Sequence, residues 1–66
     1  MVIKCGFTFK ITKNNYTGEV ISIDINNKIT TCAFFDNDGF LYGIYSVYVD
    51  TIKNNLKTGV YKLAEV

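Results

Sequence analysis

The sequence predicts a small, mainly antiparallel β fold, and three observations support this prediction. Apolar and polar residues alternate with a period of two in several short segments, as is typical of half-buried strands. Clusters of Asn, Asp and Gly separate these segments and favour tight turns. The chain has 66 residues, of which 48% are hydrophobic, so we expect one domain over residues 1–66 around one core.

The first two strands are expected on either side of an Asn- and Gly-containing turn at residues 13–18. Alternation from residue 3 to residue 11 predicts a strand with one inward face, formed by Ile3, Cys5, Phe7, Phe9 and Ile11. The second strand is expected at residues 19–25, and its predicted inward residues are Ile21, Ile23 and Ile25.

The next two strands are expected at residues 29–35 and 40–49, after turns at residues 26–28 and 36–39. In the third strand the buried face could be formed either by Ile29, Thr31, Ala33 and Phe35 or by Thr30, Cys32 and Phe34. The fourth strand is the longest and is apolar on both faces, with Phe40, Tyr42, Ile44 and Tyr48 against Leu41, Tyr45, Val47 and Val49. Gly43 lies inside it, where a glycine often marks a bulge or a bend.

A short helix is expected at residues 51–57, with Asp50 as its N-cap and Gly59 as its C-terminal stop. Ile52 and Leu56 are four residues apart and therefore lie on one side. Because so short a helix is unstable alone, we expect these two side chains to pack on the sheet. A last strand is expected at residues 60–66.

This order of four strands, a short helix and a last strand resembles an SH3-like five-stranded small barrel. Within that class, residues 16–24 (YTGEVISID) and 32–36 (CAFFD) are similar to the strand pattern of Tudor-type domains. Tudor-type domains usually place an aromatic residue after this aspartate to help hold a methylated cation, whereas this chain has Asn37 there. The resemblance therefore concerns the fold and does not transfer that function. An OB-like barrel and an open curled sheet that dimerises are the alternative folds.

The residues that most enzymes need are missing. The chain has no His, which excludes Ser-His and Cys-His pairs and the commonest general base. Asp36 and Asp38 are expected to bond to turn amides rather than to form a catalytic pair. Cys5 and Cys32 are expected to be reduced, small core residues, and without His one chain cannot supply a Cys/His zinc set. We therefore expect no catalytic residues, no metal and no cofactor.

No apolar run approaches the roughly 20 residues of a membrane helix, and the first residues do not resemble a signal peptide. We therefore expect no membrane partner and a cytoplasmic location.

Lysines form the first candidate binding surface. The net charge is +1, but residues 1–18 carry +3, residues 19–50 carry −4 and residues 51–66 carry +2. In an SH3-like barrel the first and last strands pair, so the two basic segments would adjoin. This pairing predicts a lysine face for phosphate or an acidic protein, formed by Lys4, Lys10, Lys53, Lys57 and Lys62.

Tyrosines of the fourth strand form the second candidate surface. If one face of this strand fills the core, the other leaves either Tyr42 and Tyr48 or Tyr45 exposed. Exposed tyrosines could stack bases, dock a protein or contact a second copy of the chain. Burial of both faces within one chain is the alternative.

Together these features predict a non-catalytic binding protein that occupies a surface of a macromolecular partner, first of all a protein, in the manner of small accessory or inhibitory proteins of phages and mobile elements. The alternative is a small nucleic-acid-binding barrel that uses the lysines and exposed tyrosines. A homodimer through the fourth strand is a further expectation.

Overall fold

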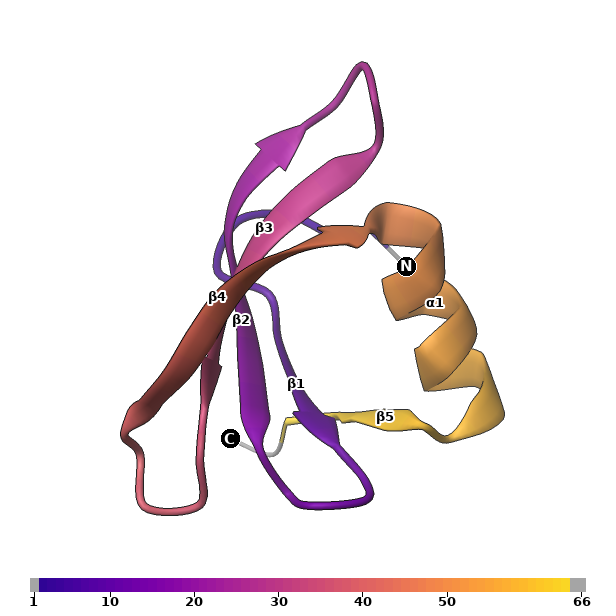
Figure 1. Cartoon of the computed structure of the whole chain (residues 1–66). Coiled ribbons are helices and arrows are strands. Elements are labelled where there is room, and N and C mark those ends of the chain that lie inside the picture. Colours follow the sequence, from indigo (N-terminus) through magenta and orange to yellow (C-terminus); the bar gives the residue numbers. More distant parts are fainter. Residues whose placement is uncertain (1, 65–66) are drawn as a thin grey trace.

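The computed structural model describes residues 2–64, and this part of the chain forms one antiparallel five-stranded sheet and one helix (Figure 1). The elements, in chain order, are β1 (Thr8–Ile11), β2 (Thr17–Asp24), β3 (Ile29–Phe35), β4 (Leu41–Tyr48), α1 (Val49–Thr58) and β5 (Tyr61–Leu63). The predicted order of four strands, a helix and a last strand is confirmed. No helix in this part of the chain is long and apolar enough to cross a membrane.

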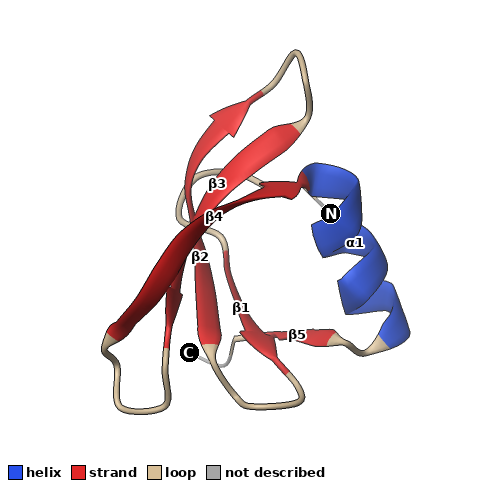
Figure 2. Ribbon diagram, viewed as in Figure 1, coloured by secondary structure: helices blue, strands red, loops and turns tan. Residues whose placement is uncertain are grey.

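The sheet is strongly curved, and its strand order is β4-β3-β2-β1-β5. The first and last strands are neighbours, as expected, with Lys10 opposite Lys62 and Ile11 opposite Tyr61. β4 and β5 lie at the two ends of the order and are not paired with each other within residues 2–64. Figure 2 shows α1 spanning the distance between the end of β4 and the start of β5.

The core lies on one face of the sheet, which we call the core face. Phe9 is fully buried at its centre, stacked on Tyr61 at 4.5 Å and edge-on to Phe34 at 5.9 Å between ring centroids. From the helix, Ile52 is fully buried and Leu56 packs against the same cluster. The predicted docking of this side of the helix is therefore confirmed.

The N-terminal segment differs from the predicted long strand. Gly6 has a φ of 89°, and Phe7 N donates to Lys4 O at 3.0 Å, so a turn interrupts the alternation before β1 begins. Phe9 and Ile3 are buried as expected, but Cys5 is exposed. The prediction that Cys5 is a core residue is wrong because the positive φ of Gly6 reorients the chain.

A bulge changes the phase of β2. The register with β3 shifts between Val20 and Ser22, so Ile21 has no opposite residue. Val20 and Ile23 point to the core, whereas Ile21 is 46% exposed and Ile25, which follows the strand, is 82% exposed. Of the three predicted inward isoleucines only Ile23 is correct, because the inserted residue puts Ile21 out of phase and Ile25 lies beyond the end of β2.

In β3, the residues that point to the core face are Thr30, Cys32 and Phe34, which settles the ambiguity between its two faces. Thr30 is a buried polar residue, and its hydroxyl donates to Val47 O at 2.6 Å. The hydroxyl is thereby satisfied within the core. Burial also raises the pKa of the Cys32 thiol, which keeps it neutral.

The ends of the last elements differ in detail from the prediction. Tyr48 is the N-cap residue and makes no side-chain capping bond, so the predicted Asp50 cap is wrong. Asp50 lies instead in the first turn, where its charge is favourable to the helix dipole. Gly59 ends the helix in the left-handed region with a φ of 88°, as predicted. Residues 65–66 of the predicted last strand lie outside the described residues.

Candidate binding groove between the sheet ends

β4 is exposed along most of its length because it is an end strand of the sheet. Its large side chains are 52–61% exposed, and this group comprises Leu41, Tyr42, Ile44, Tyr45 and Tyr48. Burial of both faces within one chain is therefore wrong. The expectation that either Tyr42 and Tyr48 or Tyr45 reaches the surface is also wrong, because all three are exposed.

A bulge at Tyr42 and Gly43 decides which of these tyrosines lie together. Phe34 is opposite Gly43, but the next residue, Phe35, is opposite Leu41, so Tyr42 is the extra residue. The bulge predicted at Gly43 is confirmed. It turns Tyr42 to the side of Tyr45, with ring centroids 6.5 Å apart, and leaves Tyr48 on the outer face. The predicted pairing of Tyr42 with Tyr48 on one face is wrong for this reason.

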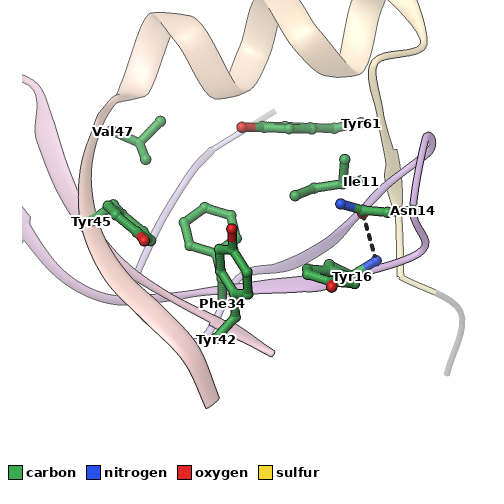
Figure 3. Close-up of a pocket in the computed structure, with 8 residues that line it drawn as sticks. All are labelled: Ile11, Asn14, Tyr16, Phe34, Tyr42, Tyr45, Val47 and Tyr61. Atoms are coloured by element: carbon green, nitrogen blue, oxygen red, sulfur yellow. Dashed lines mark hydrogen bonds between the residues drawn. The ribbon is translucent and has the colours of Figure 1, made fainter. Parts of the chain in front are cut away.

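A groove of about 260 Å³ opens between β4 and the β1–β5 end of the sheet, and we call it the tyrosine groove (Figure 3). Its lining comes from β1, β3, β4, β5 and the turn after β1, and consists of Ile11, Asn14, Tyr16, Phe34, Tyr42, Tyr45, Val47 and Tyr61. None of these eight residues is charged.

Aromatic contacts hold the groove walls. Tyr42 lies edge-on to Tyr16 at 5.2 Å, and Tyr45 contacts Phe34 at 5.9 Å between ring centroids. Tyr45 also lies over Gly43, where an added Cβ would be 2.6 Å from its ring. A glycine at the bulge therefore gives Tyr45 the space to lie along β4.

The turn before β2 positions Tyr16, which begins the opposite wall. Asn14 accepts a hydrogen bond on Oδ1 from Tyr16 N at 3.0 Å, and Asn15 takes a φ of 63°. The left-handed turn conformation expected for this Asn pair is thus confirmed. The third groove wall is Tyr61 of β5, stacked on the core residue Phe9.

The groove combines apolar rings with phenol hydroxyls. Aromatic rings offer a large apolar area, and phenol hydroxyls at their ends can bond to backbone amides and carbonyls. With no charged lining residue, the groove favours an apolar or aromatic side chain over an ion.

The structure brings together only two of the five predicted site lysines. Lys10 and Lys62 are directly opposite on β1 and β5, and with Asn15 and Leu63 they line a hollow of about 210 Å³. By strand alternation they lie on the outer face, since Ile11 and Tyr61 beside them line the tyrosine groove. The other three lie elsewhere, with Lys4 in the turn before β1 and Lys53 and Lys57 exposed on α1.

Asp36 is engaged in the turn between β3 and β4. Asp36 Oδ1 accepts from Asp38 N at 2.9 Å and from Phe40 N at 3.0 Å, the turn role that the sequence predicts for it. Within residues 2–64 no group of three metal-ligating side chains occurs.

Sequence reasoning missed Tyr16, Phe34 and Tyr61 as groove residues. Tyr16 lies in a turn, and Tyr61 begins a three-residue strand, so neither has a local signal of exposure. Only the pairing of β5 with β1 brings Tyr61 next to residues about fifty positions earlier.

Comparison of this chain with protein-family models, with curated proteins and with solved structures returns no match. Its function is therefore inferred from its own geometry.

Proposed function

We propose that this chain is a non-catalytic binding protein that attaches to another protein through the tyrosine groove. The observation that supports this proposal is an open, uncharged groove lined by four tyrosines and a phenylalanine. Tyrosine is enriched at protein interfaces because a ring with few rotatable bonds is immobilised at low entropic cost. The bound element is an apolar or aromatic side chain of the partner.

Occupation of a partner surface is the mechanism, and it requires no second domain. Such a chain modulates its partner sterically or by stabilising one conformation of it, as small accessory or inhibitory proteins of phages and mobile elements do. A groove of this size holds one large side chain, so we expect a few aromatic contacts to dominate the binding energy.

The test is affinity capture from a lysate of the source cells, followed by mass spectrometry, with three baits in parallel. These are the wild-type chain, the groove variant Tyr45→Ala and the control Phe40→Ala, which removes an exposed aromatic ring outside the groove. We expect a protein that is captured by the wild type and by Phe40→Ala and is reduced at least tenfold with Tyr45→Ala, since an interface aromatic contributes about 2 kcal/mol or more. Equal capture by all three baits, or recovery of nucleic acid alone, would contradict the proposal.

Nucleic-acid binding is a second candidate, and the placement of Lys10 opposite Lys62 favours it. Like charges directly opposite each other destabilise a sheet, and a phosphate between them would relieve this repulsion. The same face would track a phosphate backbone with a strong salt dependence.

Fluorescence anisotropy with labelled single- and double-stranded DNA and RNA at low salt tests this candidate. The double variant Lys10→Gln/Lys62→Gln should abolish binding, whereas Lys53→Gln/Lys57→Gln, with the same change of charge on α1, should retain most of it. Absence of binding by the wild type, or equal loss in both variants, would refute a phosphate site at this lysine pair.

A further inference from the structure

The two ends of the sheet are protected very differently. β5 has only three residues and carries Lys62. Short length and a lysine are two of the usual features that prevent an end strand from pairing with another chain. β4 has eight residues and contains neither a charged residue nor a proline. A long, uncharged and exposed end strand is a template for a further β-strand.

Hydrogen bonds identify which backbone groups of β4 are unpaired. Val49 N donates to Lys28 O at 2.9 Å, and this pair belongs to the same register as Thr30 with Val47. Since bonded and non-bonded pairs alternate in antiparallel strands, Val47 and Tyr45 direct their amides and carbonyls to β3. The groups of Ile44 and Ser46 and the amide of Tyr48 therefore point along the open edge, whereas the carbonyl of Tyr48, the N-cap residue, accepts the first hydrogen bond of α1.

We infer that a second copy of this chain occupies the edge, so that two β4 strands pair antiparallel about a two-fold axis at Ser46. Ser46 then pairs with the partner's Ser46, and Ile44 pairs with the partner's Tyr48. These three pairs use the outward-facing amides of Ser46 and Tyr48 and the outward-facing carbonyls of Ile44 and Ser46 in both copies. The partner is a second copy because this strand is complementary to itself.

Of the axes that pass through an outward-facing residue, the one at Ser46 uses the edge best. An axis at Ile44 would bring the bulge at Tyr42 into the pairing, and an axis at Tyr48 would bring in the first turn of α1. At Ser46, small side chains meet at the centre, and aromatic residues meet branched aliphatic ones on both sides, which are favourable cross-strand pairs. No charged side chain of β4 opposes this contact.

The dimer places the tyrosine grooves of the two copies next to each other. Tyr45 and Val47 line the tyrosine groove, and in this register Tyr45 lies opposite the partner's Val47 on the same face. The two grooves therefore adjoin across the axis. Pairing of one strand buries less than the roughly 1,600 Å² of a standard interface, so we expect dissociation in the micromolar range.

Charge at position 46 tests the dimer and its register together. In this register the two copies of residue 46 are neighbours about 5 Å apart, so Ser46→Lys and Ser46→Glu should each weaken the dimer several-fold through like-charge repulsion. An equimolar mixture of the two variants should dimerise more tightly than either variant alone, because opposite charges then meet. The control Thr31→Lys adds the same charge one strand further in, where the two lysines are about 14 Å apart and are screened at physiological salt.

Sedimentation velocity over a concentration series reads out the result, without any groove ligand, and circular dichroism verifies that each variant is folded. We expect a concentration-dependent doubling of mass for the wild type and for Thr31→Lys, and recovery of that mass in the mixture. A wild type that stays monomeric at several hundred micromolar, well above a micromolar dissociation constant, would overturn the dimer. A Ser46→Lys dimer as tight as the wild type, a mixture that dimerises no more tightly than either variant alone, or assembly beyond two copies would overturn the two-fold register at Ser46. These outcomes do not depend on whether the proposed partner protein exists.

Discussion

Gly18 and Phe9 are directly opposite each other in the β1–β2 pair, and the centre of the core depends on their contact. The fully buried Phe9 ring covers Gly18 so closely that a Cβ there would lie 2.3 Å from the ring. Phe34 and Tyr61 contact the same ring, so it has no alternative position. Because Gly18 has no Cβ, the Phe9 ring can lie directly against the backbone of β2.

Gly18→Ala is therefore expected to lower the free energy of unfolding by about 1–3 kcal/mol, the usual cost of overpacking a core. The control is Gly43→Ala, whose Cβ would meet the ring of Tyr45 at 2.6 Å. Tyr45 is half exposed and can rotate into solvent, so this change should cost less than about 1 kcal/mol. Urea unfolding of the two variants measures the difference, and equal destabilisation would show that Phe9 can also move.

Asp24 closes the turn between β2 and β3. Its carboxylate accepts hydrogen bonds from Asn27 Nδ2 at 2.8 Å and from Asn27 N at 3.2 Å, and these bonds lower the pKa of the carboxyl. Because the folded pKa lies below the unfolded one, the contribution to stability is present above a pH of about 4 and is lost as the pH falls through the folded pKa.

We expect Asn27→Ala to move the pKa of Asp24 upwards, towards the ordinary value of an aspartate, because the side-chain bond of Asn27 is the largest cause of the shift. Titration of the Asp24 carboxyl by NMR measures this change. Asn26→Ala is the matched control, since Asn26 contributes only a weaker backbone bond. An Asp24 pKa that Asn27→Ala leaves unchanged would contradict the assignment.

At the scale of elements, the pairing of β1 with β5 joins the two ends of the chain and places Lys10 opposite Lys62. Lys62→Glu turns this like-charge pair into an opposite pair and should raise the free energy of unfolding by about 0.2–1 kcal/mol. Denaturant titration at low and at high salt measures the gain, which should shrink in 1 M salt because screening weakens it. Lys4→Glu, the same change in an exposed turn, controls for net charge. An equal gain in stability there would show that the gain does not come from the pair of Lys10 with residue 62.

Most element positions could be predicted from the sequence because their signals are local. The turn at Asn15, the bulge at Gly43 and the helix end at Gly59 each follow from the conformational preferences of one residue. The bulge at Ile21 could not be predicted, since an unpaired residue is defined by the partner strand and not by its own sequence. A period of two therefore identified β2 as a strand but assigned Ile21 to the wrong face.

The candidate groove was only half predictable for a related reason. Tyr42 and Tyr45 stand out because β4 is apolar on both faces, but their exposure depends on β4 being the last strand in the sheet order. Tyr16 and Tyr61 complete the groove through contacts that only the folded sheet creates. Strand order is set by pairing between distant segments, which periodicity along the chain does not encode.

At the scale of the whole molecule, the chain is too small to cover its own apolar surface. The largest fully buried side chains are Phe9, Val20, Thr30, Cys32 and Ile52. A domain of about 60 residues buries only about 60% of the surface that its unfolded chain exposes, so its stability is marginal. Pairing through β4 would cover part of the exposed apolar surface of this strand and so link stability to assembly.

The melting temperature should consequently depend on protein concentration. A dimer that dissociates on unfolding gains about 1.4 kcal/mol per tenfold increase in concentration, or about 0.7 kcal/mol per chain. For a domain of this size that corresponds to a rise of roughly 3–6 °C per tenfold increase, over the range in which the dimer is populated.

Calorimetry of the wild type and of Ser46→Lys over a concentration series measures this dependence of the melting temperature. At each concentration at which the wild type is a dimer, the variant should melt at a lower temperature, because it leaves the backbone of β4 intact and weakens only the contact between copies. A wild type that melts at one temperature throughout the series would show that the open edge of β4 contributes nothing to stability through self-pairing.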